Sequence, residues 1–349
     1  MQVGLSILPR VFPILAEISA LTLAIACSET TNPGETYRLR DRIVFQSDRL
    51  DVKRDIFSMA LDGSDVRRLT TDSTWDACPS VSPDGESIAY TRENSDLGIM
   101  RGDGSDQRIL LPKAGSNYMC PIWSPDGEYI ASTDGNKIFV VSRDGVLYMT
   151  IPGTTTESSI ISLAYSPDGT RLLVSEGIPD RSNNSFDRRV WSVRTNNAER
   201  GTSVRGLDAS WTPKGDSVLY TCFDDLYASP IDYRICMKSA EGTARLMLTT
   251  QTTSSPFFTP NGNRIAFVCE GGLCVMNRDG SNPQRWTIGG SRFAWAPNAQ
   301  MLVFHCGISD PGRFNDEICA VSGDGTNFRN LTRNPGGDDY PSFSPLSSQ

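Results

Sequence analysis

A turn signal, Ser-Pro-Asp-Gly, recurs through the chain and constrains its fold more than any other feature. Its complete and degenerate copies begin at Ser82, Ser124, Ser166, Thr212, Thr259, Ala296 and Ser344. These seven anchor residues are 42, 42, 46, 47, 37 and 48 residues apart. A period in the forties is the length of one four-stranded propeller blade, so the repeat predicts an all-β propeller.

Each repeat also carries the strand and turn pattern that a blade needs. The residue before each anchor is large and apolar, and an apolar residue such as Ile88 follows six positions after each of the first six anchors. We expect first and second strands at these two places, third strands such as Lys137–Ser142 and Gly272–Asn277, and short fourth strands. Pairs such as Asp62-Gly63, between third and fourth strands, predict type I′ hairpin turns.

The two ends of the repeat complement each other. Ile43–Phe45 has the pattern of a second strand without an anchor before it, and Pro341–Pro345 that of a first strand with only four residues after it. We expect the C-terminal strand to complete the N-terminal blade, which closes the ring and removes an exposed edge. Six complete repeats and one composite predict a single seven-bladed propeller over residues 42–349, with six blades as the alternative count.

Residues 1–26 differ from the rest of the chain. An apolar run, Val11–Ala26, ends in small residues before Cys27, which indicates a secretory signal. The pattern resembles the bacterial lipoprotein signal, in which the cysteine becomes the lipidated first residue of the mature chain. A plain cleaved signal and a membrane anchor are the alternatives, although about 16 apolar residues are short for a spanning helix. Residues 27–41 then form a polar tether.

The charge balance argues against two classes of partner. The formal net charge is −8 and the sequence pI is about 4.9. Nucleic acid needs a basic footprint, and so does peripheral binding to anionic lipid. We therefore expect no nucleic-acid partner, and membrane contact only through a lipid on Cys27.

The eight cysteines after Cys27 recur at equivalent places in the repeat. One cysteine ends a second strand and another lies in the next third strand, which pairs Cys222 with Cys236, Cys269 with Cys274 and Cys306 with Cys319. Residues directly opposite on antiparallel strands have Cα atoms about 4.5 Å apart at non-hydrogen-bonded sites, within disulfide range. The turn at Gly271-Gly272 predicts that Cys269 lies opposite Cys274.

Cys78 and Cys120 begin the first strands of neighbouring repeats, so a bond between them would join two blades. Buried free thiols are the alternative for all four pairs, and metal ligation is a third option, although the spacings contain no C-x-x-C pair. Disulfides indicate an oxidising compartment, which agrees with the secretory signal.

The sequence offers little for catalysis. His305 is the only histidine, so a Ser-His-Asp triad would have to use it, and no G-x-S-x-G motif is present. We interpret His305 as structural and expect no catalytic residue and no cofactor. The acidic residues Asp51, Asp55 and 62–65 could bind Ca²⁺ but lack the EF-hand spacing, so we interpret them as solvated turns and expect no metal.

The channel mouth, meaning the end of the central channel at which the first strands begin, is the best candidate for a binding surface. The residues expected at this rim are Asp76, Tyr118, Asp208, Arg292, Asp338, Asp339 and Tyr340. Acidic and aromatic groups predominate, which suits a basic or polar peptide. The alternative is that these side chains are solvated loop ends.

Two stretches carry a resemblance to a known family. Arg67–Thr70, followed by Pro79–Gly85 and Ile88–Tyr90, resembles the repeat of TolB-type propellers, and so does Phe328–Thr332 followed by Pro341–Pro345. The resemblance covers the chain from about residue 42 and implies the fold more specifically than the function. TolB is periplasmic and holds an outer-membrane lipoprotein at its propeller face. This sequence shows no N-terminal α/β domain and seven blades rather than six, so that partner does not carry over.

The resemblance implies a non-enzymatic, monomeric lipoprotein of the bacterial envelope that binds a protein or peptide at the channel mouth. Ser28 after Cys27 resembles the signal for the outer membrane. The first alternative is a polysaccharide lyase or hydrolase that uses channel carboxylates, because related repeats occur in oligogalacturonate lyases, although these normally need several histidines. The second alternative is a carbohydrate-binding or metal-binding module.

Overall fold

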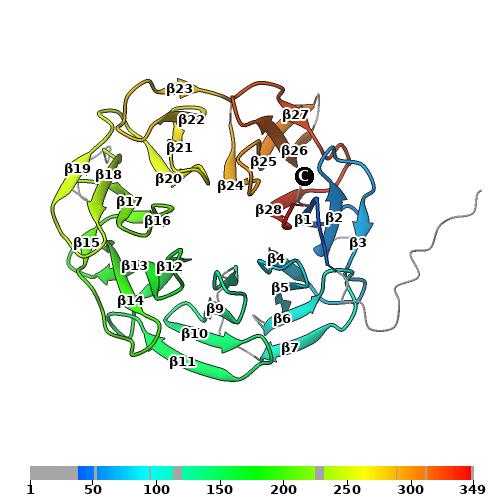
Figure 1. The fold of residues 1–349 in the computed structure, drawn as a ribbon, viewed down its shortest axis with the longest axis horizontal. Coiled ribbons are helices and arrows are strands. Elements are labelled where there is room, and N and C mark those ends of the chain that lie inside the picture. Colours follow the sequence, from blue (N-terminus) through cyan, green and yellow to red (C-terminus); the bar gives the residue numbers. More distant parts are fainter. Residues whose placement is uncertain are drawn as a thin grey trace, which may run out of the picture. The chain divides into compact units, whose positions relative to one another are not determined.

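Seven four-stranded antiparallel sheets make up the fold (Figure 1). The computed structural model describes residues 38–50, 53–93, 96–112, 120–224, 232–287, 289–310 and 313–346. The sheets surround a central channel, and the first strand of each sheet is innermost (Figure 1). The predicted seven-bladed propeller is thus confirmed, and the alternative of six blades was wrong.

We number the blades in chain order from the N-terminus. Blade 1 contains β28 (Asp338–Phe343), β1 (Arg42–Ser47), β2 (Asp55–Ala60) and β3 (Arg67–Arg68). Blade 2 contains β4 (Asp76–Val81), β5 (Ser87–Arg92), β6 (Asp96–Arg101) and β7 (Arg108–Leu111). Blade 3 contains β8 (Ile122–Trp123), β9 (Tyr129–Thr133), β10 (Lys137–Ser142) and β11 (Leu147–Pro152).

The other four blades repeat this order of strands. Blade 4 contains β12 (Ser159–Tyr165), β13 (Arg171–Asp180), β14 (Ser185–Arg194) and β15 (Val204–Arg205). Blade 5 contains β16 (Leu207–Trp211), β17 (Ser217–Cys222), β18 (Arg234–Ser239) and β19 (Arg245–Met247). Blade 6 contains β20 (Ser254–Phe258), β21 (Arg264–Cys269), β22 (Gly272–Asn277) and β23 (Gln284–Arg285). Blade 7 contains β24 (Ser291–Trp295), β25 (Met301–Asp310), β26 (Arg313–Ser322) and β27 (Arg329–Asn330).

The ring closes as the two ends of the repeat predict. The C-terminal strand β28 pairs antiparallel with β1, with Ile43 opposite Phe343 and Ser47 opposite Asp338. It occupies the innermost place of blade 1, beside three strands from the other end of the chain (Figure 1). Closure removes a free edge that would otherwise expose unpaired backbone groups.

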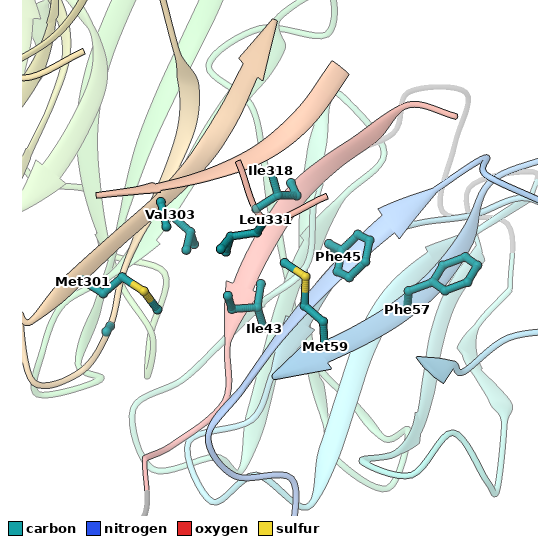
Figure 2. Packing of buried hydrophobic residues seen from close by; sticks show 10 residues of the cluster. Ile43, Phe45, Phe57, Met59, Met301, Val303, Ile318 and Leu331 are labelled. Atoms are coloured by element: carbon teal, nitrogen blue, oxygen red, sulfur yellow. The ribbon is translucent and has the colours of Figure 1, made fainter. Parts of the chain in front are cut away.

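Apolar packing between neighbouring blades holds the ring together. Figure 2 shows this packing between blades 1 and 7, where the buried side chains include Ile43, Phe45, Phe57, Met59, Met301, Val303, Ile318 and Leu331. Comparable buried clusters lie at the other junctions. Full burial of one such side chain contributes roughly 1.5–3 kcal/mol, so stability is distributed around the ring as a sum of junctions.

The hairpin turns between third and fourth strands differ from the predicted type. At Asp62-Gly63, the Ala60 N–H donates to the Ser64 carbonyl (2.8 Å), the Gly63 N–H donates to the Ala60 carbonyl (3.0 Å), and Gly63 has a φ of 89°. The φ of Asp62 is not positive. A type I′ turn needs positive φ at both central positions. The type I′ prediction was therefore wrong: this is a type I turn followed by a left-handed glycine.

Four disulfides join the eight cysteines in the pairs inferred from the sequence. They connect Cys78 to Cys120, Cys222 to Cys236, Cys269 to Cys274, and Cys306 to Cys319. The first joins blades 2 and 3, and the other three each lie within one blade.

The register of the three hairpin disulfides differs from the expectation. Cys269 lies opposite Gly272, and Cys274 lies opposite Phe267, so the two cysteines are diagonal neighbours with Cα atoms 5.7 Å apart. The other two hairpin disulfides have the same offset and a Cα separation of 5.8 Å. Strand twist brings one diagonal of an antiparallel pair closer than the other, which is why a diagonal pair can be bridged.

The predicted signal sequence, Cys27 and most of the tether lie outside the described residues. Within the range expected for the tether, Leu39 is only 1% exposed and its N–H donates to the Gly85 carbonyl (2.7 Å). Packing against the propeller thus begins before β1. Among the described residues, no helix is long and apolar enough to cross a membrane.

Candidate binding site at the channel mouth

A repeated backbone irregularity shapes the channel mouth. Five residues four positions before an anchor have positive φ: Cys78 (54°), Asp208 (50°), Ser255 (51°), Arg292 (50°) and Tyr340 (53°). The strand register shifts around each of them, as a β-bulge requires. A bulge bends its strand and re-aims a side chain. Because L-residues other than glycine rarely adopt this φ, the fold imposes a strained conformation at the same level of five inner strands.

Four of the predicted mouth residues occupy these positions or the one beside them and remain accessible. Arg292 is exposed, and Asp208, Asp339 and Tyr340 are half-buried. Asp208 accepts a hydrogen bond from the Ser255 hydroxyl (3.0 Å). Tyr118 lies outside the described residues.

The structure places the other two predicted mouth residues differently. Asp76 and Asp338 are 0% exposed and lie at the junctions between blades, so the expectation that they reach the rim is corrected. Both stand six residues before an anchor, at the first residue of the inner strand, whereas Asp339 is the second residue of β28. Since the side chains of a strand alternate between faces, neighbouring residues can have opposite environments.

Arg292, Asp339 and Tyr340 form one interacting group across the junction of blades 7 and 1. The Arg292 guanidinium donates from Nη1 to Asp339 Oδ2 (2.6 Å) and lies over the Tyr340 ring, with Cζ 4.1 Å from the ring centroid. The Asp339 side chain is 13% exposed and that of Arg292 is 44% exposed. The second oxygen of Asp339 accepts the Tyr340 backbone N–H (2.8 Å).

Burial controls the electrostatics of the two mouth carboxyls. It raises the pKa of Asp339, while the Arg292 guanidinium acts in the opposite direction. Burial also raises the pKa of Asp208, and the Ser255 hydroxyl and Arg188 partly offset this change. Both carboxyls therefore favour their neutral form more than a solvated carboxyl does, and a cation beside either would favour its charged form.

His305 belongs to the same junction, which sequence reasoning missed. Its Nδ1 lies 2.8 Å from the Ser291 hydroxyl and its Nε2 lies 2.8 Å from Asp316 Oδ1. An ionised carboxylate only accepts hydrogen bonds, so Nε2 carries the proton in this arrangement and Ser291 donates to Nδ1. The signal available was the repeat, because Ser291 stands five residues before its anchor, as Asp339 does.

The hydroxyl–imidazole–carboxylate order of this group invites comparison with a catalytic triad. The Asp316 side chain is 48% exposed, whereas the carboxylate that orients a catalytic imidazole is buried. We keep the structural interpretation of His305. Among the described residues, no group of three or more His, Cys, Asp or Glu side chains is placed to hold a metal ion.

A polar cleft of about 880 Å³ lies beside the mouth between blades 5 and 6. Threonine, serine and glutamine side chains from residues 250–254 line one wall, and Tyr233, Glu270 and Arg285 line others. The loop before β20 and the β21–β22 turn both lie at the end of the blades where inner strands begin. The cleft therefore opens on the same side of the molecule as the channel mouth.

Comparison with known proteins agrees with this architecture. A family model described as the TolB beta propeller domain matches residues 93–347, so the chain belongs to this family of propellers. A comparison with the sequences of curated proteins finds no match.

Solved structures that resemble the chain include proteins with different activities. TolB from Acinetobacter baumannii is 16% identical with a TM-score of 0.53, covering 87% of this chain and 83% of its own. An oligogalacturonate lyase from Vibrio parahaemolyticus is 9% identical with a TM-score of 0.59, covering 84% and 87%. The propeller domain of the Trilobed protease from Pyrococcus furiosus is 13% identical with a TM-score of 0.59, covering 85% and 94%. At these identities the likeness shows the fold alone.

Proposed function

We propose that this TolB-family propeller is a non-enzymatic binding protein of the bacterial envelope that holds a protein or peptide at its channel mouth. The observation that carries the proposal is the repeated bulge, which presents Asp208, Arg292 and Tyr340 from three blades at one level. Asp339 adds a half-buried carboxyl beside them. Charged and aromatic groups on a rigid rim suit the recognition of a polar or basic segment, because opposite charge steers the encounter and fixes its register.

The location in the envelope rests on three supports. The first is the predicted secretory signal over residues 1–26, before Cys27. The second is membership of the TolB propeller family. The third is the set of four disulfides, which form in oxidising compartments. We further propose that Cys27 carries a lipid, that Ser28 directs the protein to the outer membrane, and that it is monomeric there.

The test is capture of the partner from native envelopes after mild cross-linking. The Asp339→Asn/Tyr340→Ala double variant should lose a stoichiometric partner, since it removes the carboxylate and the ring at the mouth. Glu128→Gln is the matched control, because it removes an exposed carboxylate from the turn between β8 and β9, at the opposite end of the blade. Equal capture by the double variant and the wild type would contradict binding at the mouth.

The lipid anchor is tested with the same preparation. A Cys27→Ser variant should be released from washed membranes into the soluble fraction and should lose labelling by a radioactive fatty acid. Retention on the membrane without the cysteine would contradict the anchor and favour an uncleaved apolar segment.

Carbohydrate binding is a second candidate function, and the cleft between blades 5 and 6 favours it. Hydroxyl and amide groups from residues 250–254 can both donate and accept hydrogen bonds, which is the chemistry that a sugar presents. Saturation-transfer NMR with neutral oligosaccharides tests it. A saturation-transfer signal that disappears in Gln251→Ala but not in Asp339→Asn would show that the ligand binds in the cleft and not at the mouth.

A further inference from the structure

Asp339 and Tyr340 together offer the chemistry of a cation site. A carboxylate supplies charge and hydrogen-bond acceptance, and the face of an aromatic ring attracts a cation through its quadrupole. The two residues are adjacent on β28, and the Tyr340 N–H fixes one oxygen of Asp339 (2.8 Å). The other oxygen is left for a ligand, and the ring stands beside it.

The protein itself supplies the occupant of this site. The Arg292 guanidinium, from β24 of blade 7, is hydrogen-bonded to Asp339 (2.6 Å) and stacked at 4.1 Å over Tyr340 of blade 1. These are the two contacts that the guanidinium of a ligand would make. Arg292 reaches them from a backbone position with a φ of 50°, which arginine rarely adopts.

The internal contact is exchangeable because its two partners differ in exposure. The Arg292 side chain is 44% exposed, so water and ligand reach it, and displacement does not require unpacking of a core. The Asp339 side chain is 13% exposed in the pair, and burial already raises the pKa of its carboxyl. A partly buried carboxylate without a partner is costly, so the vacated site favours another cation.

We propose that Asp339 and Tyr340 form a cation-binding site that Arg292 fills in the free protein and that an arginine or lysine side chain of the partner takes over by displacing it. The inference rests on the proposed function, because it names the chemistry of the ligand at the same mouth. Arg292 acts here as an internal competitor, so its removal should strengthen the binding of small cations. A merely structural role for the Arg292–Asp339 pair makes no such prediction.

The experiment is a titration of the full chain with N-acetyl-arginine methylamide, followed by NMR or calorimetry. The neutral N-acetyl-citrulline methylamide, which has nearly the same shape, is the control ligand. The Arg292→Ala variant should bind the arginine probe at least five to ten times more tightly than the wild type and should discriminate against the citrulline probe. Adding Asp339→Asn or Tyr340→Leu to Arg292→Ala should abolish the gain, and thermal unfolding checks that each variant is folded.

The titration is best made at pH 8 and repeated at pH 5.5. The charged or titratable groups that act on Asp339 are Arg292, His305 and Asp316. Because burial already favours the neutral form of Asp339, protons should compete with the arginine probe, and the gain in Arg292→Ala should shrink at pH 5.5.

The outcomes separate the cation site from the proposed function. Unchanged or weaker arginine binding in a folded Arg292→Ala protein would overturn the site, even if a partner is captured at the mouth. Tighter binding of the arginine probe that Asp339→Asn abolishes would establish the cation site. If no partner is captured at the same time, the cation site stands and the proposed function is contradicted. Equal binding of the arginine and citrulline probes would also overturn the proposal, because charge would not be recognised.

Discussion

Two buried carboxyls at equivalent places in neighbouring blades have different environments. Asp338 and Asp76 both stand six residues before an anchor, begin an innermost strand and are 0% exposed. Asp338 accepts hydrogen bonds from Arg49 (2.8 Å) and from the Asn334 amide (2.6 Å). Among the described residues, no donor makes a hydrogen bond to either oxygen of Asp76, and its nearest cation is Arg92, with Nε 3.8 Å away.

One substitution in the repeat explains much of this difference. The place of Asn334, ten residues before its anchor, is taken by Asp72 in the repeat that contains Asp76. Asp72, which is more exposed than Asp76, forms an ion pair with Arg92. The Arg92 guanidinium is therefore closer to Asp72 than to Asp76. An amide donor has thus been replaced by a carboxylate that competes with Asp76 for Arg92.

The difference in environment shifts the pKa of Asp76. Burial raises its pKa from 3.8 to about 7, the nearby Thr70 hydroxyl lowers it, and the charges of Asp55 and Glu93 raise it further. Thr70 itself donates to Asp55, at 3.4 Å. The comparison teaches that the same buried position is stabilised by donors at one junction and by uptake of a proton at the next.

The largest expected effect is at the bonded junction. Arg49→Ala should destabilise the protein by roughly 3–5 kcal/mol, because it leaves Asp338 buried with a partner removed and also removes a guanidinium that lies over Phe45 and Phe57 (5.1 Å to each ring). Denaturant unfolding measures the change. Adding Asp338→Asn should recover part of the loss, and Arg92→Ala at the other junction should cost less. An equal loss of stability for Arg49→Ala and Arg92→Ala would contradict the difference inferred between the two junctions.

The second effect concerns the covalent bond that one of the two inner strands makes to a neighbouring blade. The strand of Asp76 carries Cys78, bonded to blade 3, where the strand of Asp338 carries Tyr340. Cys78→Ser with Cys120→Ser should cost about 4 kcal/mol by loop entropy, since the bond spans 42 residues, against about 2 kcal/mol for removing Cys269–Cys274, which spans 5. Unfolding of both double variants under the same oxidising conditions measures this. A larger loss for the short loop would contradict the entropic account.

The third prediction uses one substitution at both junctions. Asp76 binds its proton more tightly when folded, so it contributes stability that is fully present below about pH 4 and is lost as pH rises to about 7. The loss is at most about 4 kcal/mol and is less where the site relaxes. Asp76→Asn should flatten this part of the pH profile and raise the melting temperature at pH 8.

Asp338→Asn is the matched control for that prediction, because it should lower the melting temperature at pH 8 by weakening the bond to Arg49. The expected result is therefore a change in melting temperature of opposite sign for the two variants. A decrease for both variants would mean that the Asp76 carboxylate has a stabilising partner after all.

The smallest expected effect is at Tyr90, whose hydroxyl is buried with no hydrogen-bond partner among the described residues. Its pKa is raised by burial and by Asp76. Tyr90→Phe should leave stability unchanged or raise it by up to about 1 kcal/mol, because it removes an unsatisfied polar group. Thermal unfolding at pH 8 measures the change. A clear loss would show that the hydroxyl has a partner, such as a bound water shared with Asp76.

The sequence by itself determined the architecture. A turn signal with a period in the forties, a six-residue offset to the next strand and complementary ends define the blade, the number of blades and the closure, because each depends on local turn chemistry and strand periodicity. The disulfide pairs followed as well, since equivalent positions of a repeat recur in space.

Only the tertiary structure decided which rim residues are accessible. Asp338 and Asp339 are adjacent in sequence, yet one is buried at a junction and the other faces Arg292 of another blade. The diagonal register of the disulfides and the contacts of His305 with Ser291 and Asp316 were equally hidden. Local patterns specify strands and turns, but the twist of each blade and the bulge in its inner strand set which side chains meet across a junction.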